Sequence, residues 1–193
     1  MRFKESITPE EIESLELISF PGEIKIITEN GAAFDDAIED LATSRIIGFD
    51  TETKPVFQPH APRCPTALLQ LSNEDTAYLF RLHTLGVPDP LADILASSSI
   101  TKVGAAVADD VRGLQHYNRF EAARFMDLQR FAEAYGITDK SVKKLAGIIL
   151  GRRVSKAQQL SNWEASTLSY AQQLYAATDA WICLVMYKAL LAS

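Results

Sequence analysis

Two acidic residues one position apart follow a short apolar stretch, and their spacing suggests metal-dependent chemistry. Asp50 and Glu52 come directly after residues 46–49, which are mostly apolar. Residues i and i+2 of a strand point to the same side, so a strand here would present both carboxylates together. Two such charges about 4 Å apart repel by roughly 4 kcal/mol at an effective dielectric near 20. A shared proton, a basic partner or a metal ion relieves this repulsion, whereas acids lying in solvent beyond the strand need none of these.

Acidic residues at two other places have both a functional and a structural explanation. Tyr175 and Asp179 are four residues apart in a helical pattern, so their side chains share one face of that helix. Asp179 stands among apolar neighbours, where burial without a partner would be costly. Asp109 and Asp110 lie where a strand passes into a helix, and acids in a first helical turn are also ordinary helix-capping residues. Taken singly, none of these acids settles the function.

The elements that must position these residues follow a mixed α/β pattern. Five apolar stretches, beginning near residues 24, 46, 67, 76 and 101, indicate strands. The three strands at 46, 67 and 76 have short connections, which predicts an antiparallel meander. Four prolines indicate a loop over residues 54–65. From about residue 108 the pattern is mainly helical, and Ser169 begins the final helix.

Length and composition are those of one globular domain covering residues 1–193. Hydrophobic residues make up 47% and charged residues 23%, and we find neither a signal peptide nor an apolar run long enough to cross a membrane. A cytoplasmic location is therefore expected, and Cys64 and Cys183, which lack metal-ligand spacing, are expected to be free thiols. The net charge of −6 argues against binding nucleic acid through bulk positive charge, although a local basic rim is compatible with it.

Three motifs in order resemble those of the DnaQ-like 3′–5′ exonucleases (the DEDD superfamily), in the branch whose third motif is Tyr-x-x-x-Asp. The first is Phe49-Asp50-Thr51-Glu52, the second is Val103-Gly104 with Asp110 after five further residues, and the third is Tyr175-Ala176-Ala177-Thr178-Asp179. Flanking residues 67–71, 127–128, 161–163 and 173–177 agree as well. The sequence is most similar to ribonuclease D and Werner-type exonuclease domains, over about residues 24–191.

This resemblance implies a ribonuclease H-like fold, with a five-stranded mixed sheet flanked by helices. It implies these catalytic residues: Asp50, Glu52, Asp110, Tyr175 and Asp179. The four acids among them would hold two divalent ions, Mg²⁺ or Mn²⁺, because hard cations prefer carboxylate oxygens. We expect Asp50 to bridge both ions and Tyr175 to orient the attacking water. Asp109 is the alternative to Asp110 in the second motif.

The expected reaction is hydrolysis of phosphodiester bonds from the 3′ end of DNA or RNA, single-stranded or frayed, releasing nucleoside monophosphates by a two-metal-ion mechanism. The expected substrate contacts are Lys54, Arg152, Arg153 and Lys156, with Arg63 and Arg112 as further candidates. Each of these cations could instead be a solvated surface charge. Two alternatives remain, namely a non-catalytic nucleic-acid-binding or scaffold module and a hydrolase of small oligonucleotides. The helical nucleic-acid-binding module of full ribonuclease D has no counterpart in this sequence, which predicts weak processivity or dependence on a protein partner.

Overall fold

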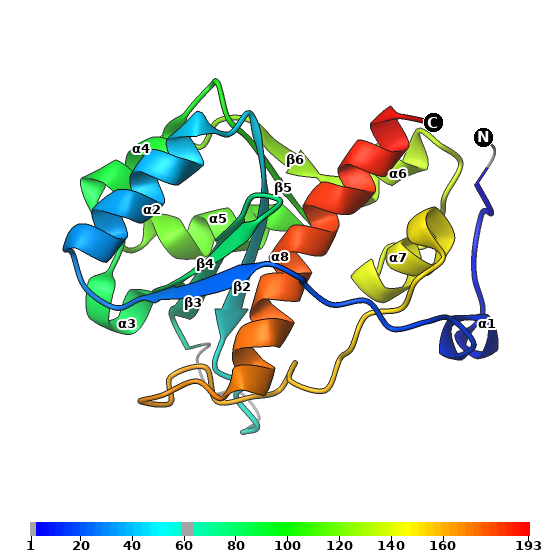
Figure 1. Cartoon of the computed structure of the whole chain (residues 1–193), viewed down its shortest axis with the longest axis horizontal. Coiled ribbons are helices and arrows are strands. Elements are labelled where there is room, and N and C mark those ends of the chain that lie inside the picture. The colour runs from blue at the N-terminus through cyan, green and yellow to red at the C-terminus, as the bar shows by residue number, and fades with distance from the viewer. Residues whose placement is uncertain (1–2, 59–63) are drawn as a thin grey trace.

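A mixed sheet of six strands forms the centre of the computed structural model, which describes residues 3–58 and 64–193 (Figure 1). In spatial order the strands are β1 (Glu23–Ile27), β4 (Thr76–Arg81), β3 (Thr66–Ser72), β2 (Ile46–Thr53), β5 (Thr101–Gly104) and β6 (Phe125–Asp127). β2, β3 and β4 form the predicted antiparallel meander. β1, β5 and β6 join the sheet by parallel pairing.

The expectation of five strands was wrong, because β6 adds a sixth. This strand has three residues, Phe125–Asp127, and pairs in parallel with β5. A segment this short shows no alternation of apolar and polar residues, and its last residue also caps the helix that follows. Its extended conformation therefore follows from pairing with β5, which a local sequence pattern does not reveal.

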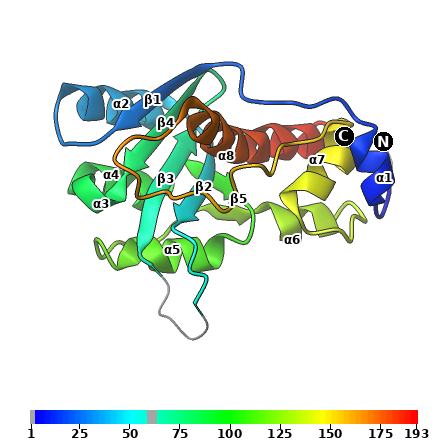
Figure 2. The same ribbon diagram turned by 90° about the horizontal axis from the view of Figure 1, so that it is seen from below.

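Helices cover both faces of the sheet, as the view in Figure 2 shows. One core lies under α2 (Ala32–Thr43), α3 (Leu82–Leu85), α4 (Asp89–Ala96) and α5 (Val107–Gln115), and the other lies under α6 (Leu128–Glu133), α7 (Val142–Leu150) and α8 (Tyr170–Leu191). α1 (Pro9–Glu13) packs on α7. Because both faces are covered, every residue of the central strand β3 is buried.

The long helix α8 crosses the sheet and carries the third motif. Ser169 caps its first turn, accepting a hydrogen bond from the backbone of Gln172, whose side chain binds back to Ser169. Among the described residues α8 alone has the length and apolarity of a membrane-spanning helix, but 61% of that stretch is buried inside the protein. Its apolar character is therefore that of a core helix. On this helix Cys183 is a free thiol, as is Cys64.

Candidate active site

The end of β2 and the middle of α8 bring three carboxylates together. Phe49 points into the core under α2 and α5, so Asp50 and Glu52, on alternate positions, face the other side, where α8 lies. Ligand oxygens of Asp50, Glu52 and Asp179 all lie within 4.8 Å of one another. The spacing rules for strands and helices had each predicted one part of this arrangement. The fold joins the two parts.

A close approach between β2 and α8 makes this meeting possible. At Gly48 a Cβ atom would lie only 2.0 Å from the backbone oxygen of Ala180, the residue after Asp179. Any larger residue at this position would push the strand and the helix apart. The glycine therefore sets the separation between the strand that carries Asp50 and the helix that carries Asp179.

Burial raises the pKa of each carboxyl group in the cluster, and repulsion from neighbouring acids raises the pKa of Asp50 and Glu52 further. Burial raises the pKa of Asp50 well above its usual range, and the charges of Asp179 and Asp110 raise it further. Burial, followed by the charges of Asp50, Asp179 and Asp110, raises the pKa of Glu52 to about 10. The pKa of Asp179 is raised to about 7 by burial, although a hydrogen bond from Tyr175 and the charge of Lys156 oppose this shift. A positive charge bound beside these carboxyl groups would therefore favour their deprotonation.

Tyr175 lies one turn before Asp179 and hydrogen-bonds to its carboxylate. Its ring packs against Trp163, with ring centroids 6.0 Å apart, and only 8% of the residue is exposed. Burial, and then the charges of Asp179 and Glu52, raise the pKa of the phenol. The hydroxyl group therefore stays protonated at neutral pH and can donate or orient a hydrogen bond, but cannot act as a base.

The second motif places its two acids in different surroundings at the start of α5. One carboxylate oxygen of Asp110 accepts a hydrogen bond from the Thr51 hydroxyl at 2.6 Å, so Asp110 faces β2. Burial raises the pKa of Asp110, and its charge in turn raises the pKa of Asp50 and Glu52. Asp109 is largely exposed and forms an ion pair with Arg112. The geometry favours Asp110 as the acid that belongs with the cluster.

A cleft in two connected parts gives access to the acids. One part is lined by the three-acid cluster, Tyr175, Lys156 and the start of α7. The other part is lined by Lys54, Asp110, Arg112 and Leu160, among others. Thr51, Glu52 and Gln159 border both parts, so the two form one continuous cleft.

The predicted basic contacts are divided between the cleft and other surfaces. Lys156 lines the cleft beside the acids, and Lys54 lines its second part, where it pairs with Glu164 at 3.1 Å. Arg152 instead pairs with Glu16 at 2.7 Å, and Arg153 donates to the backbone oxygen of Leu15. Among the described residues, neither of these two arginines lines either part of the cleft. Arg63 lies outside the described residues.

Two features of the site were missed by reasoning from sequence. The Thr51 hydroxyl holds Asp110, although Thr51 points away from its neighbours Asp50 and Glu52. Ser141 and Gln159 border the cleft from segments with no chemical motif of their own. Both contacts arise from tertiary packing, and no local pattern signals them.

The fold and the acidic site define a nuclease-like domain, and comparison with known proteins identifies its family. A family model described as 3′-5′ exonuclease matches residues 25–193, so the chain belongs to the 3′-5′ exonuclease family. The chain is 36% identical over 152 residues to exonuclease 3′-5′ domain-containing protein 2 of Drosophila melanogaster, covering 77% of this chain and 26% of that protein. It is 30% identical over 195 residues to the bifunctional 3′-5′ exonuclease/ATP-dependent helicase WRN of Mus musculus, covering 92% of this chain and 13% of that protein. The chain thus spans about a quarter or less of these curated relatives.

Solved structures show the same fold at lower sequence identity. The EXO domain of Aedes aegypti Nibbler matches with a TM-score of 0.79 and 21% identity, over 91% of each chain. Trypanosoma brucei ribonuclease D in complex with RNA U12 matches with a TM-score of 0.77 and 18% identity, over 95% of this chain and 65% of that chain. The resemblance to ribonuclease D and Werner-type domains and the ribonuclease H-like fold are therefore confirmed.

Proposed function

We propose that this chain is a metal-dependent exonuclease that hydrolyses phosphodiester bonds from the 3′ end of a nucleic acid and releases nucleoside monophosphates. The observation that carries the proposal is the cluster of Asp50, Glu52 and Asp179, whose ligand oxygens lie within 4.8 Å of one another. Three half-buried carboxylates that repel one another do not stabilise a fold by themselves. A site that binds cations requires such an arrangement.

The donor set fits hard divalent ions, and we propose Mg²⁺ or Mn²⁺, two ions per site. Described residues that offer oxygen ligands here are the three clustered acids and Asp110, which is positioned by Thr51. Asp50 would contribute to both ions, Glu52 and Asp179 to one of them, and Asp110 to the other. When bound, two such ions activate a water molecule and stabilise the leaving oxygen of a phosphodiester.

The other residues of the cleft have roles that follow from their chemistry. Tyr175 keeps its proton and lies beside Asp179, so its hydroxyl is suited to orient the attacking water. Lys156 lines the same part of the cleft and is suited to contact a substrate phosphate. Lys54 is suited to a second phosphate contact in the adjoining part. Substrate would have to displace its ion pair with Glu164, which is partly exposed to solvent and therefore screened.

The proposed substrate is a single-stranded or frayed 3′ end, of DNA or RNA. Support for nucleic acid comes from the family and from the RNA complex of the trypanosomal ribonuclease D. The residues described act on phosphates, which DNA and RNA share. The sugar preference is therefore a question for measurement.

A digestion with matched oligonucleotides tests the proposal. Wild-type protein is incubated with 5′-labelled DNA and RNA of one sequence, with Mn²⁺, Mg²⁺ or EDTA. We expect a ladder of products shortened one nucleotide at a time, nucleoside monophosphates in solution and no reaction in EDTA. The same digestion with 5′-labelled dinucleotides shows whether short substrates are preferred.

Each other outcome of this digestion has a definite meaning. Cleavage of dinucleotides alone would identify a small-oligonucleotide hydrolase in place of the proposed enzyme. Binding without cleavage under every metal condition would identify a non-catalytic nucleic-acid-binding module.

A further inference from the structure

One continuous segment of this acidic protein is strongly basic. Residues 140–156, here called the basic wall, contain six basic residues and no acidic one in a chain whose net charge is −6. They are Lys140, Lys143, Lys144, Arg152, Arg153 and Lys156. The wall comprises α7 and the segment after it, and residues near both of its ends, Ser141 and Lys156, line the cleft beside the acids. The wall is therefore continuous with the proposed active site.

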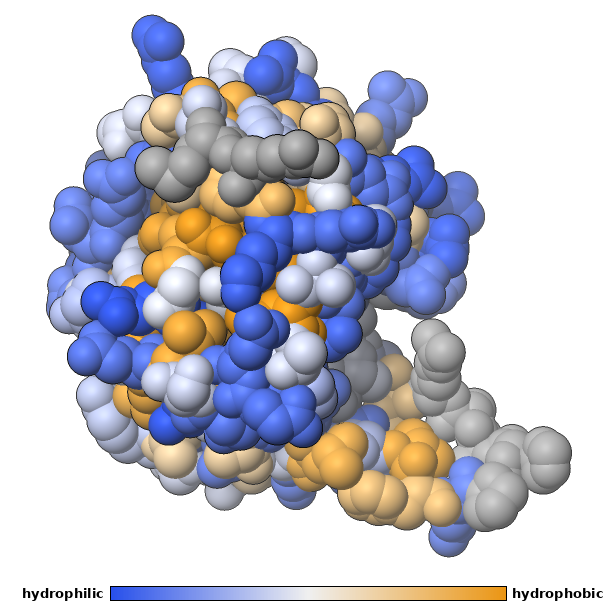
Figure 3. All heavy atoms as spheres, turned by 90° about the vertical axis from the view of Figure 1, so that its right-hand side faces the viewer, coloured by the Kyte–Doolittle hydropathy of each residue, from blue (hydrophilic) through white to orange (hydrophobic). Residues whose placement is uncertain are grey.

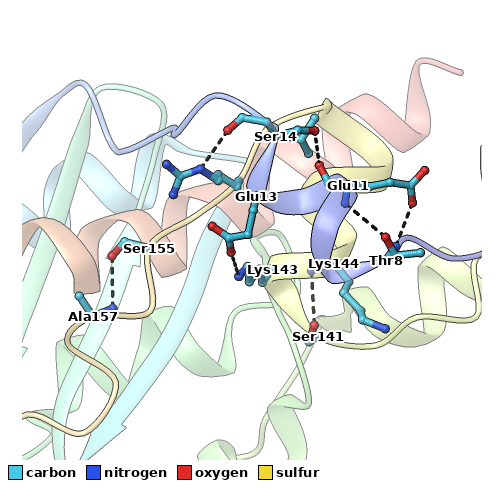
Figure 4. Close-up of polar contacts among 11 residues, drawn as sticks. Thr8, Glu11, Glu13, Ser14, Ser141, Lys143, Lys144, Ser155 and Ala157 are labelled. Carbon is cyan, nitrogen blue, oxygen red and sulfur yellow. Dashed lines mark hydrogen bonds and ion pairs between the residues drawn. The ribbon is translucent and has the colours of Figure 1, made fainter.

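An acidic segment from the start of the chain lies against this wall. Residues 3–20, here called the N-terminal arm, contain five glutamates and one lysine, and they precede the residues matched by the family. Glu13 pairs with Lys143 at 2.6 Å, and Glu16 pairs with Arg152 at 2.7 Å. Figure 4 shows Glu13 reaching Lys143 from α1. Two cations of the wall are thus paired with acids of the arm.

The arm is held in place by contacts other than these ion pairs. Ile7 and Ile12 are buried, and both lie close to Gly147 of α7. The backbone of Leu17 pairs with that of Arg153, and the amide of Phe20 donates to the Thr178 hydroxyl on α8. This side of the molecule faces the viewer in Figure 3, where hydrophilic groups surround an apolar area. Removing the two glutamate charges should therefore leave the arm docked.

The glutamates pair with the wall weakly and can be exchanged for other anions. The side chain of Glu13 is 63% exposed and that of Glu16 is 79% exposed. Exposed ion pairs contribute little to stability and are screened by salt. A phosphodiester backbone presents anions in a row and binds grooves lined with lysine and arginine. Lys143 and Arg152 are therefore available to phosphates that displace the carboxylates.

We propose that the basic wall binds the phosphate backbone of a single nucleic-acid strand leading into the cleft, and that Glu13 and Glu16 of the arm compete with those phosphates for Lys143 and Arg152. This surface rests on the proposed exonuclease function, because the strand it binds is the one whose 3′ end enters the cleft. The arm thereby lowers the affinity for substrate, and the charges of its two carboxylates determine the size of this decrease.

Binding measured without hydrolysis tests the surface. The probes are 5′-fluorescein-labelled 15-nucleotide strands of deoxythymidine and of uridine, followed by fluorescence anisotropy in EDTA between 50 and 200 mM NaCl. We expect Glu13→Gln/Glu16→Gln to bind about fivefold more tightly than wild type at 50 mM NaCl. Because each single-strand phosphate contact adds about −0.7 to the slope of log affinity against log salt, two added contacts should steepen it by about 1.4.

A matched control separates this surface from a general change in charge. Glu23→Gln/Glu74→Gln also removes two negative charges. These charges belong to ion pairs with Lys25 and Lys188, which lie away from the basic wall. We expect this control to bind within about twofold of wild type. Lys143→Gln/Arg152→Gln should weaken binding and should abolish the gain when added to the arm variant. Thermal melting of each variant confirms that it is folded.

The outcomes distinguish this inference from the proposed function. An equal increase in affinity for the labelled strands in the two double glutamate variants would refute the proposed binding surface. Undetectable binding by folded Glu13→Gln/Glu16→Gln at 50 mM NaCl would refute it as well. If the protein shortens oligonucleotides but gives either of these results, the exonuclease proposal stands and the basic-wall proposal is wrong. If the variants bind as expected but the protein never shortens a strand with Mn²⁺ or Mg²⁺, the basic-wall proposal stands and the exonuclease proposal is wrong.

Discussion

Asp40 and the three-acid cluster of the cleft show two ways in which one fold surrounds its acids. Asp40, on α2, accepts hydrogen bonds from the side-chain amide of Asn73 and the hydroxyl of Tyr78, both at 2.7 Å. In the cleft, Asp50, Glu52 and Asp179 lie within reach of one another and raise the pKa of neighbouring acids in the cluster. An acid supplied with donors stabilises the fold. Acids left to repel one another indicate a site that needs something from outside the chain.

The largest expected difference between the two regions is in activity. Asp50→Ala and Asp179→Ala should each abolish nearly all exonuclease activity without unfolding the protein, because each removes a proposed metal ligand. Asp40→Ala should leave the rate close to that of wild type. The measurement is the rate at which a 5′-labelled oligonucleotide is shortened, with circular dichroism as the folding control. If either site variant kept more than about a tenth of the wild-type rate, a barrier change below about 1.4 kcal/mol, the assignment would be wrong.

The two hydroxyl groups that face these acids offer a matched pair of variants. Tyr175→Phe should lower the rate by roughly 10²-fold, as expected for loss of a group that orients the attacking water. It keeps the packing of the ring, so stability and the midpoint of a Mn²⁺ titration should change little. Tyr78→Phe should leave the rate unchanged and lower the free energy of unfolding by about 1 kcal/mol, because Asp40 loses a donor. Normal turnover by Tyr175→Phe would make that tyrosine only a core residue.

A smaller difference in rate should separate Asp110 from Asp109. Asp110→Asn should lower the rate by at least about tenfold, because the carboxylate that Thr51 positions toward β2 loses its charge. Asp109→Asn should stay within about twofold of wild type, because Asp109 is exposed and paired with Arg112. Parallel digestions under saturating Mn²⁺ provide the comparison. The opposite ranking would move the second-motif acid by one residue.

Stability should respond in opposite directions at the two regions. In EDTA, Asp50→Asn should be more stable than wild type by roughly 1 kcal/mol, because a repelling charge is removed. Asp40→Ala should be less stable by about 1–3 kcal/mol, because two part-buried donors, on Asn73 and Tyr78, lose their acceptor. Thermal melting of both variants tests this contrast. An Asp50→Asn protein less stable than wild type would instead give Asp50 a structural role.

Metal and pH should shift the stability of the cleft in a predictable way. The pKa of Asp179 is raised to about 7 and that of Glu52 to about 10, so the folded protein keeps protons that the unfolded chain releases near pH 4. The free energy of unfolding in EDTA should therefore be highest near pH 4 and fall as pH rises toward 7 and beyond. Mn²⁺ should restore about 2.7 kcal/mol at a hundredfold excess over Kd, and Na⁺ of equal ionic strength should restore less. Melting curves indifferent to millimolar Mn²⁺ would count against a preformed site.

Local spacing predicted the parts of the site, and tertiary contacts assembled them. The positions of Asp50 and Glu52 on one strand face, and of Tyr175 and Asp179 on one helix face, follow from the periods of strand and helix. The meander was predictable because its connections are short. β6 was not, because its three residues take their conformation from a neighbour distant in sequence. For the same reason no local pattern paired Glu16 with Arg152.

The contact of Gly48 with Ala180 has a consequence for the order in which the protein is made. Synthesis runs from the N-terminus, so a growing chain exposes Asp50 and Glu52 long before Asp179 and the rest of α8 leave the ribosome. Contacts between segments so distant in sequence form late in folding, after the sheet that α8 must cover. Until α8 docks at Gly48, the nascent chain lacks the third carboxylate of the cluster. The three-acid cluster is therefore incomplete until α8 has left the ribosome and docked on the sheet.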